Sequence, residues 1–369
     1  KILDLGSVEA GNPDEKLLAK AADELQSASP DLEIGYSAGK RWVLKIDYAD
    51  QAKLEATSLP EHPHLLFTGG GYGITAEAIL GLSRERKCKF TIIGRTRLPD
   101  NIAELARLDG PGLEQKRLEI HQALKEKGGK VTPLMVQTEY ETLVKAISIY
   151  NAIRRIEQNG SQVLYISCDV TDFNGLKKAL ASSKAKFGPV DGLVYAAGIE
   201  KSKLMAEKTV AEFKKIFMVK AAGLCNLFRL IDLNELKAFI GFSSISGRFG
   251  NEAQSDYCAA NSFINTFVAM VRSMHPKIHA VSLVWSGWKD TGMAWRNEFV
   301  KTHSEEMGIH LIEPERGTAA FIQHLTHRGV AGEIILSKGL HSFIDGRMLK
   351  EPLHATPFID WVTRQDGKY

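Results

Sequence analysis

The sequence predicts an α/β fold built on a doubly wound parallel sheet of about seven strands with flanking helices. Two observations carry this prediction: short apolar runs recur from about residue 62, and segments with helical periodicity separate them. Strands that alternate with helices form right-handed βαβ units, which place successive strands parallel to one another. The expected strands are 64–69, 90–94, 163–169, 192–198, 238–244, 279–285 and 333–338.

Composition limits the classes of function. The 369 residues are 44% hydrophobic and 25% charged, as in ordinary globular proteins, and the net charge is +3. This small charge gives no reason to expect nucleic acid or an anionic membrane as a partner. Every apolar run is shorter than the roughly 18 residues of a membrane helix, and no signal peptide is visible. The four cysteines lack metal-ligand spacing. We therefore expect a cytoplasmic protein with reduced thiols and no metal.

The flanks of the regular pattern have their own signals. Residues 13–25 predict an amphipathic helix, and residues 32–48 predict two strands around a turn at 37–40. The sequence begins with Lys1 and lacks an initial Met, so we interpret it as part of a longer polypeptide.

One connection is too long for a single crossover. About 68 residues separate the second and third expected strands, and we interpret residues 101–160 as a helical insertion. A first helix is expected over 110–130, and Thr132 followed by Pro133 predicts the start of a second. In the second helix apolar residues recur at helical spacing. A structural elaboration is the favoured interpretation, and contact with a partner is the alternative.

A glycine-rich stretch, TGGGYG at residues 68–73, lies between the first strand and a helix starting near Ile74. Glycines here permit positive φ and let the backbone approach a pyrophosphate at the positive end of the helix. This position in the first βα unit favours a Rossmann-like dinucleotide site over an ordinary tight turn. The candidate contacts are Thr68, Gly69, Gly71, Tyr72, Gly73 and Ile74.

Arg95 follows the second strand, 22 residues after Gly73. NAD sites usually carry an acid there to bind the ribose hydroxyls, whereas an arginine accommodates a 2′-phosphate. A guanidinium is always charged and has a forked geometry that suits a phosphate. Arg95, with its neighbour Thr96, therefore predicts NADPH as the cofactor. Arg97 either assists or is simply solvated.

Several motifs in order resemble one family. The stretches TGGGYGI, CDVTD, YAAG, FSSISG with YCAAN, and LVWSGW are similar to the short-chain dehydrogenase/reductase superfamily. More narrowly, they resemble ketoreductase domains of multifunctional polyketide and polyunsaturated-fatty-acid synthases, over about residues 62–348. The resemblance implies a linker and the remnant of a structural subdomain at 1–60, an NADP-binding ketoreductase domain at 61–350, and a C-terminal linker at 351–369. It implies an acyl carrier protein and other synthase domains of the same polypeptide as partners.

Four residues are candidates for catalysis. Tyr257 could protonate the oxygen of a ketone, and Ser244, 13 residues earlier, could polarise the carbonyl by a hydrogen bond. Ordinary family members carry a lysine four residues after the tyrosine, where this sequence has Asn261, and an asparagine where it has Lys220. The resembling synthase ketoreductases show the same exchange. We therefore expect Lys220 to lower the pKa of Tyr257 and relay protons, with Asn261 positioning it.

Other residues complete the expected site by resemblance. The adenine-contacting pair is Asp169 and Val170, with a helix N-cap as the competing role of Asp169. The further cofactor contacts are Ala196, Ala197, Gly198 and Thr291. Residues 284–299 are expected to pass the nicotinamide and form a substrate-side lid, with Trp288 and Met293 as guesses. Core packing is an equal alternative for Trp285. The surface is expected for His303, His310 and His324.

The sequence departs from the family pattern at three places. The third small position of the glycine loop is Thr75, and the two common markers of alcohol configuration are replaced by residues 200–202 and Phe249. The configuration of the alcohol is therefore left open. The expected function is NADPH-dependent reduction of a 3-oxoacyl thioester tethered to acyl carrier protein. The alternatives are a freestanding reductase of a free ketone and a catalytically silent nucleotide-binding scaffold.

Overall fold

The computed structural model describes residues 2–4, 15–27, 33–37, 40–43, 46, 54–128, 130–296, 310–329 and 332–338. The chain divides into two compact units. The smaller comprises Lys1–Ala49, Ser304–Ile309 and Lys338–Tyr369, and the larger comprises Asp50–His303 and His310–Ser337. No helix among the described residues is long and apolar enough to cross a membrane.

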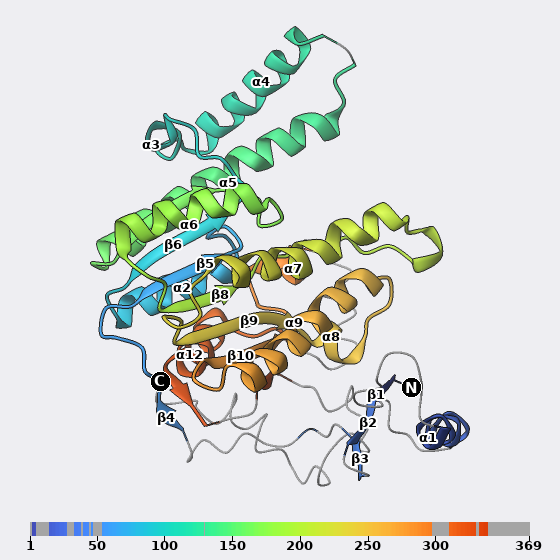
Figure 1. The fold of residues 1–369 in the computed structure, drawn as a ribbon. Helices are drawn as coiled ribbons and strands as arrows, with labels where there is room; N and C mark the ends of the chain where they lie inside the picture. Colours follow the sequence, from blue (N-terminus) through green and yellow to red (C-terminus); the bar gives the residue numbers. More distant parts are fainter. Residues whose placement is uncertain are drawn as a thin grey trace. The chain divides into compact units, whose positions relative to one another are not determined.

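A seven-stranded sheet, parallel throughout, organises the larger unit (Figure 1). Its spatial order is β12-β10-β9-β8-β5-β6-β7. All seven predicted strands are confirmed. Their bounds are β5 (His64–Thr68), β6 (Lys89–Gly94), β7 (Gln162–Ser167), β8 (Gly192–Tyr195), β9 (Ala238–Ser244), β10 (His279–Trp285) and β12 (Glu333–Leu336). β5 and β8 are buried along their whole length, as their continuous apolar sequences require in a sheet covered on both faces.

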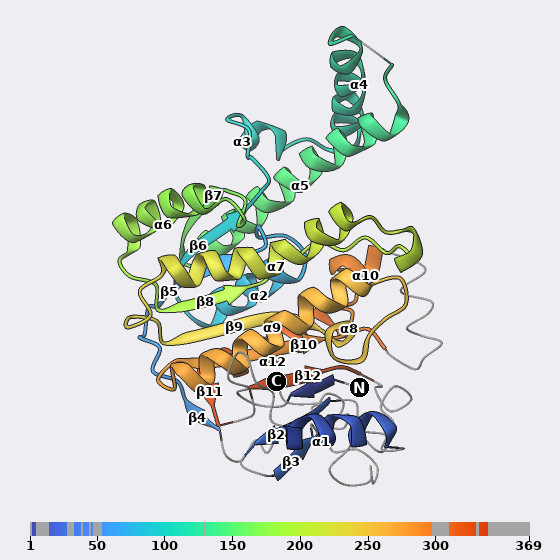
Figure 2. The same cartoon turned by 45° about the vertical axis from the view of Figure 1, so that its right-hand side comes forward.

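Helices cover both faces of this sheet (Figures 1 and 2). α2 (Ile74–Glu85) packs against α5 (Pro133–Gln158) and α12 (Pro314–Thr326) on one face. On the other face, α7 (Val210–Leu230) packs against α6 (Phe173–Phe187) and α9 (Ser255–Met274). The chain order reverses at β5, which pairs with β6 on one side and β8 on the other. Dinucleotides bind at the carboxyl ends of the strands at such a reversal.

The expected insertion contains α3 (Ile102–Leu105), α4 (Gly110–Glu126) and α5. The Thr132 hydroxyl accepts a hydrogen bond from the Met135 amide, which confirms the predicted helix start. The C-terminal part of α5 buries Ile149 and Ile156 against the larger unit, so α5 also serves as the crossover helix from β6 to β7. The insertion is therefore shorter than predicted. α4 and the start of α5 extend beyond the sheet edge (Figure 2).

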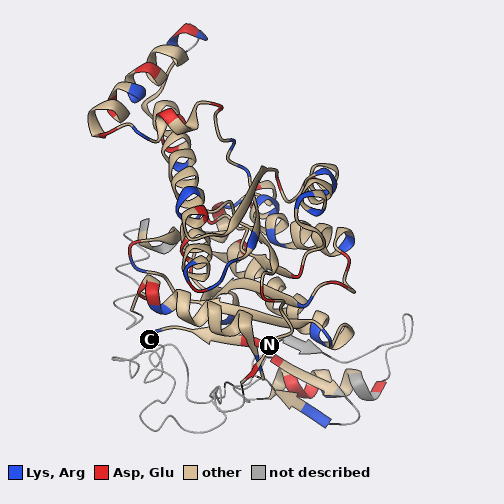
Figure 3. Ribbon diagram, turned by 90° about the vertical axis from the view of Figure 1, so that its left-hand side faces the viewer, with Lys and Arg blue, Asp and Glu red and all other residues tan. Residues whose placement is uncertain are grey.

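Charges of both signs alternate on these projecting helices, at the top of Figure 3. Lys116 pairs with Glu119 and Arg117 with Glu114 on α4. Ion pairs of this exposed kind contribute little to stability, and they give the projection no single-sign field.

The smaller unit contains the other predicted elements. α1 (Glu15–Gln26) confirms the N-terminal helix, and β2 (Glu33–Ser37) and β3 (Lys40–Val43) form the expected antiparallel pair, with β1 (Ile2–Asp4) parallel to β2. The Glu24 carboxylate lies between the Tyr36 hydroxyl and the Arg41 guanidinium. The proposed linker at 351–369 lies outside the described residues, and the domain limits remain a prediction.

Candidate active site

The glycine loop after β5 has the backbone that the sequence predicts. Gly69, Gly70, Gly71 and Gly73 all have positive φ, between 59° and 105°, a region that favours glycine. Gly73 precedes α2 and leaves its first turn without a side-chain cap, so amide groups there stay available. A helix start of this kind favours an anion, and the loop therefore fits a pyrophosphate.

The loop is held tightly from two sides. The Gly69 and Gly70 amides donate to the Ile93 carbonyl oxygen, and a Cβ on Gly94 would lie 2.3 Å from the Gly70 Cα. On the other side the buried Thr68 hydroxyl accepts hydrogen bonds from the Ala196 and Ala197 amides, at 3.1 and 3.0 Å. Thr68 and the segment after β8 therefore lie together, as predicted. Thr75 also packs here, since its hydroxyl lies 3.0 Å from where a Gly69 Cβ would be.

The residues after β6 lie open to solvent. Arg95 is exposed, and its guanidinium has no hydrogen bond or ion pair within the part of the chain that the structure describes. The Thr96 carbonyl oxygen accepts a hydrogen bond from the Tyr165 hydroxyl at 2.7 Å. The Lys145 ammonium on α5 lies 5.5 Å from the ring centroid of Tyr72, so the crossover helix reaches the glycine loop.

Asp169 does not cap a helix. Its carboxylate accepts hydrogen bonds from the Thr171 amide and hydroxyl, at 2.8 and 2.7 Å. The cap of α6 is Asp172, whose side chain accepts from the Gly175 amide. The competing role considered for Asp169 is therefore wrong, because two acids three residues apart offer the same local signal. Val170 is buried and packs in the core beneath this turn.

The structure brings three of the four catalytic candidates into hydrogen-bonding contact. Tyr257 has side-chain hydrogen bonds with Ser244 and Asn261, which act to lower the pKa of its phenol. Burial has the larger effect and raises that pKa to about 12, and the Glu200 carboxylate acts in the same direction. Asn261 also donates to the Tyr257 carbonyl oxygen at 2.8 Å, while its own side-chain oxygen is buried without a partner.

Lys220 approaches the same point from α7. Its ammonium donates to the Phe242 carbonyl oxygen at 2.8 Å, and a Cβ on Gly198 would lie 3.7 Å from it. Burial lowers the pKa of Lys220 to about 7. The segment after β8, the end of β9 and the start of α9 therefore meet around Lys220. The expected effect of Lys220 on Tyr257 stays a prediction.

The segment after β10 agrees only in part with expectation. Thr291 and Gly292 lie beside the glycine loop, since a Cβ on Gly73 would lie 3.8 Å from the Thr291 hydroxyl. Met293, in α10 (Gly292–Arg296), is 42% exposed. Trp288 is fully buried against Trp285 and Gly317, so its guessed place on a lid is wrong. Residues 297–299 lie outside the described residues.

The histidines divide three ways. His310 is exposed as expected, and His303 lies outside the described residues. His324 is 4% exposed on the inner face of α12, so its predicted surface position is wrong, and burial lowers its pKa to about 4. The described residues contain no cluster of potential metal ligands, and all four cysteines are free.

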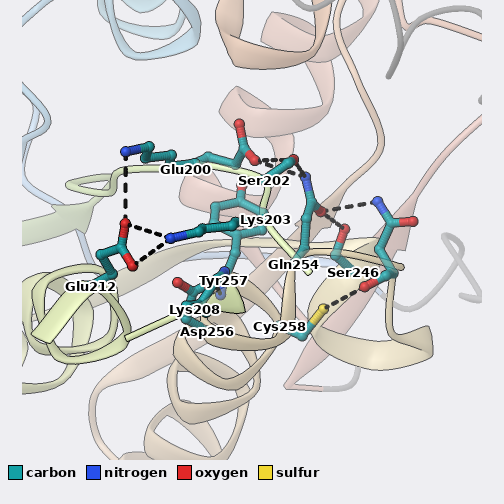
Figure 4. A network of polar contacts seen from close by, with 12 residues as sticks. Glu200, Ser202, Lys203, Lys208, Glu212, Ser246, Gln254, Asp256, Tyr257 and Cys258 are labelled. Carbon is teal, nitrogen blue, oxygen red and sulfur yellow. Dashed lines mark hydrogen bonds and ion pairs between the residues drawn. The ribbon is translucent and has the colours of Figure 1, made fainter. Parts of the chain in front are cut away.

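Sequence reasoning missed a polar network next to Tyr257 (Figure 4). The buried Gln254 amide donates to Glu200 and Ser202 and accepts from Ser246 and Asn251. Close by, Lys208 and Asp256 form an ion pair of 2.5 Å. The only sequence signal was an acid immediately before the tyrosine, and its partner is 48 residues away.

Comparison with known families places the chain. The KR domain family model matches residues 64–290, which is more than half of the chain. The chain belongs to the KR domain family. KR domains are ketoreductase domains, and the seven-stranded Rossmann-like sheet agrees with the solved structures of such domains. The fold and family predictions are therefore confirmed, and the KR domain is an oxidoreductase of a family that uses a nicotinamide cofactor.

The relatives are parts of large synthases. The KR domain is 28% identical over 278 residues to one polypeptide of the polyunsaturated fatty acid synthase of Thraustochytrium sp., covering 74% of the chain and 10% of the relative. It is 29% identical over 195 residues to polyketide synthase PksL of Bacillus subtilis, covering 51% and 4%. A solved ketoreductase domain from the bacillaene assembly line matches with a TM-score of 0.65 and 22% identity, covering 89% and 68%. The chain thus spans a tenth or less of these curated relatives.

Proposed function

We propose that this KR domain reduces a 3-oxoacyl thioester to the 3-hydroxyacyl thioester with NADPH. The observation that carries the proposal is the convergence of Ser244, Tyr257 and Asn261 with the buried Lys220 beside the segment that contacts the glycine loop. A hydroxyl donor, a polarising hydroxyl and a nearby buried amine are the groups that carbonyl reduction requires.

The cofactor would lie along the carboxyl ends of the central strands. The glycine loop and the start of α2 would hold the pyrophosphate, and Arg95 would pair with a 2′-phosphate. Thr96, Asp169 and Val170 would flank the adenosine half. The small residues Ala196, Ala197 and Gly198, with Thr291, would border the nicotinamide half. The positive φ values and the close Gly94–Gly70 approach support this cradle, since side chains there would fill it.

When bound, the nicotinamide supplies a hydride to the carbonyl carbon. Ser244 donates a hydrogen bond to the carbonyl oxygen and so favours the charge that develops there. Tyr257, with a pKa of about 12, keeps its proton at neutral pH and donates it to this oxygen. Lys220, with a pKa of about 7, can give up a proton near neutral pH to restore the phenol. The unpartnered Asn261 oxygen offers an acceptor on that route.

The substrate and partners follow from the relatives. The matched synthases are large proteins of which the chain covers a small part, so we propose that the substrate is a chain tethered to acyl carrier protein. Other domains of the same polypeptide would then be neighbours of the KR domain. We also propose the limits 1–60, 61–350 and 351–369 for the leading segment, the reductase domain and the trailing linker.

The test is NADPH oxidation in the presence of the N-acetylcysteamine thioester of a 3-oxo acid, with NADH in parallel. Tyr257→Phe should lower the rate about 100-fold or more because the proton donor is removed. Comparing the thioester with its carrier-bound form and with a simple ketone separates a synthase domain from a freestanding reductase. NADPH binding without reduction of any of these substrates would support a silent scaffold.

A further inference from the structure

The loop between β8 and α7 is joined to the turn before Tyr257 at three points. Gln254 donates to Glu200 and Ser202 near the start of the loop. In the middle of the loop, the Lys203 amide donates to the Ala253 carbonyl oxygen at 2.8 Å. At its end the Lys208 ammonium reaches Asp256. The loop therefore runs beside residues 253–256 over most of its length.

The third contact is the most buried of the three. The side chains of Lys208 and Asp256 are 3% and 1% exposed, and the ammonium lies 2.5 Å from the carboxylate. The same Asp256 oxygen accepts the Tyr257 amide at 2.8 Å, so one oxygen joins the loop to the first turn of α9. Figure 4 shows Lys208 and Asp256 beside Tyr257.

Two observations argue that this pair does more than stabilise the fold. A buried ion pair gives little net stability, because the loss of hydration offsets its attraction. The second Asp256 oxygen is also buried without a hydrogen-bond partner, which adds a cost. A hydrophobic pair would fill this position at least as well, so its use here points to a requirement for directed contacts.

The backbone at the turn is strained as well. Ala253 has φ of 60°, a left-handed conformation that residues with a side chain rarely adopt. The strain falls four residues before the candidate proton donor, and the contacts from Lys203 and Gln254 hold the turn from the facing loop. Strain that neighbouring contacts maintain is common where a functional side chain must be aimed.

We propose that Lys208 and Asp256 are positioning residues for Tyr257, and that their buried ion pair clasps the loop after β8 onto the first turn of α9. The inference rests on the proposed role of Tyr257 as proton donor. The clasp sets the direction in which Tyr257 enters the site and keeps the loop at residues 200–208 against it. Its effect should therefore be on the chemical step and not on cofactor binding.

The test removes the clasp and keeps the helix cap. In Lys208→Met/Asp256→Asn both charges are lost together, while the asparagine oxygen can still accept the Tyr257 amide. We expect kcat for the 3-oxoacyl N-acetylcysteamine thioester to fall about 10- to 100-fold, as a misplaced catalytic group does. The KM of the thioester and the Kd of NADPH should stay within about 2-fold, since the clasp touches neither.

Hydrogen exchange supplies a readout that needs no turnover. The amides of residues 254–258 should exchange at least about 10-fold faster in the double variant, because the turn loses its partner. Lys208→Gln keeps a donor for Asp256 and is the second variant, should the double variant not fold; it should lose kcat in the same sense. Lys208→Arg restores the charge and should recover most of the wild-type kcat.

The matched control is Lys203→Met. Lys203 lies in the same loop and its ammonium pairs with Glu212, 3.0 Å away, but this pair is about 30% exposed and does not involve α9. It should leave kcat and exchange near wild type. Wild-type kcat with wild-type exchange in the double variant would overturn the proposal, and so would a rise in KM alone. If the wild-type protein reduces no carbonyl, the proposed function fails, and the exchange experiment still decides whether the clasp exists.

Discussion

The Lys220 ammonium donates a hydrogen bond to the Phe242 main-chain oxygen across 2.8 Å, and both residues are buried. Lys220 belongs to α7, and Phe242 lies in β9 two residues before Ser244. The contact therefore joins the candidate proton relay to the strand that ends in the candidate polarising residue. With its pKa lowered to about 7 by burial, this amine can change protonation near neutral pH.

This burial predicts a particular pH dependence of stability. The folded protein gives up the Lys220 proton near pH 7, whereas the unfolded chain keeps it to about pH 10.5. Between these values the unfolded state binds more protons, so raising the pH stabilises the folded state, by up to about 1.4 kcal/mol per pH unit. Lys220→Met lacks this gain. Urea unfolding of both proteins from pH 7 upward measures the difference, and parallel profiles would contradict it.

Arg95 should decide the choice between the two nicotinamide cofactors. Because its side chain is exposed and unpaired among the described residues, its removal should cost the fold little. Arg95→Asp should weaken NADPH binding about 10- to 100-fold, the value of a lost charge-assisted contact with phosphate. NADH binding should stay level or improve. Fluorescence titration with both cofactors measures this, and Arg97→Asp is the control for a general loss of positive charge.

Gly94 should tolerate no side chain. Its Cβ would lie 2.3 Å from the Gly70 Cα and 3.0 Å from the Tyr165 hydroxyl, so the glycine loop would have to move. Gly94→Ala should lower the free energy of unfolding by about 1–3 kcal/mol and weaken NADPH binding. Gly110→Ala is the matched control, because a Cβ at Gly110 meets nothing within 4 Å. Urea unfolding and cofactor titration of both variants test the prediction; equal effects would refute it.

Local patterns were sufficient for most of the fold. Continuous apolar runs identified the buried strands, and Thr132 with Pro133 identified the start of α5. The glycine loop and the Ser244–Tyr257 spacing depend on short segments whose structure is set by nearby residues. His324 could also have been placed correctly, since it shares the inner face of α12 with Phe321 and Leu325 at helical spacing.

Contacts between distant segments were beyond the sequence. Lys208 and Asp256 are 48 residues apart, and nothing in either neighbourhood identifies the partner. Trp288 was misplaced because an aromatic residue in a motif can line a site or fill the core, and only the facing Gly317 decides between them. The dual use of α5 likewise depends on which of its turns meet the sheet.

The cap of α5 allows the projection to be loosened while the site stays unchanged. The Thr132 hydroxyl accepts the Met135 amide at 3.3 Å, and Thr132→Ala should cost about 1 kcal/mol of local stability. Thr138→Ala is the control on the same helix, since the Thr138 hydroxyl donates to the Leu134 carbonyl oxygen inside the helix and alanine favours helix there. Hydrogen exchange in residues 133–141 should rise only in Thr132→Ala, with kcat for the thioester unchanged in both variants. A fall in kcat for Thr132→Ala would mean that the start of α5 is coupled to the glycine loop, where Lys145 lies against Tyr72.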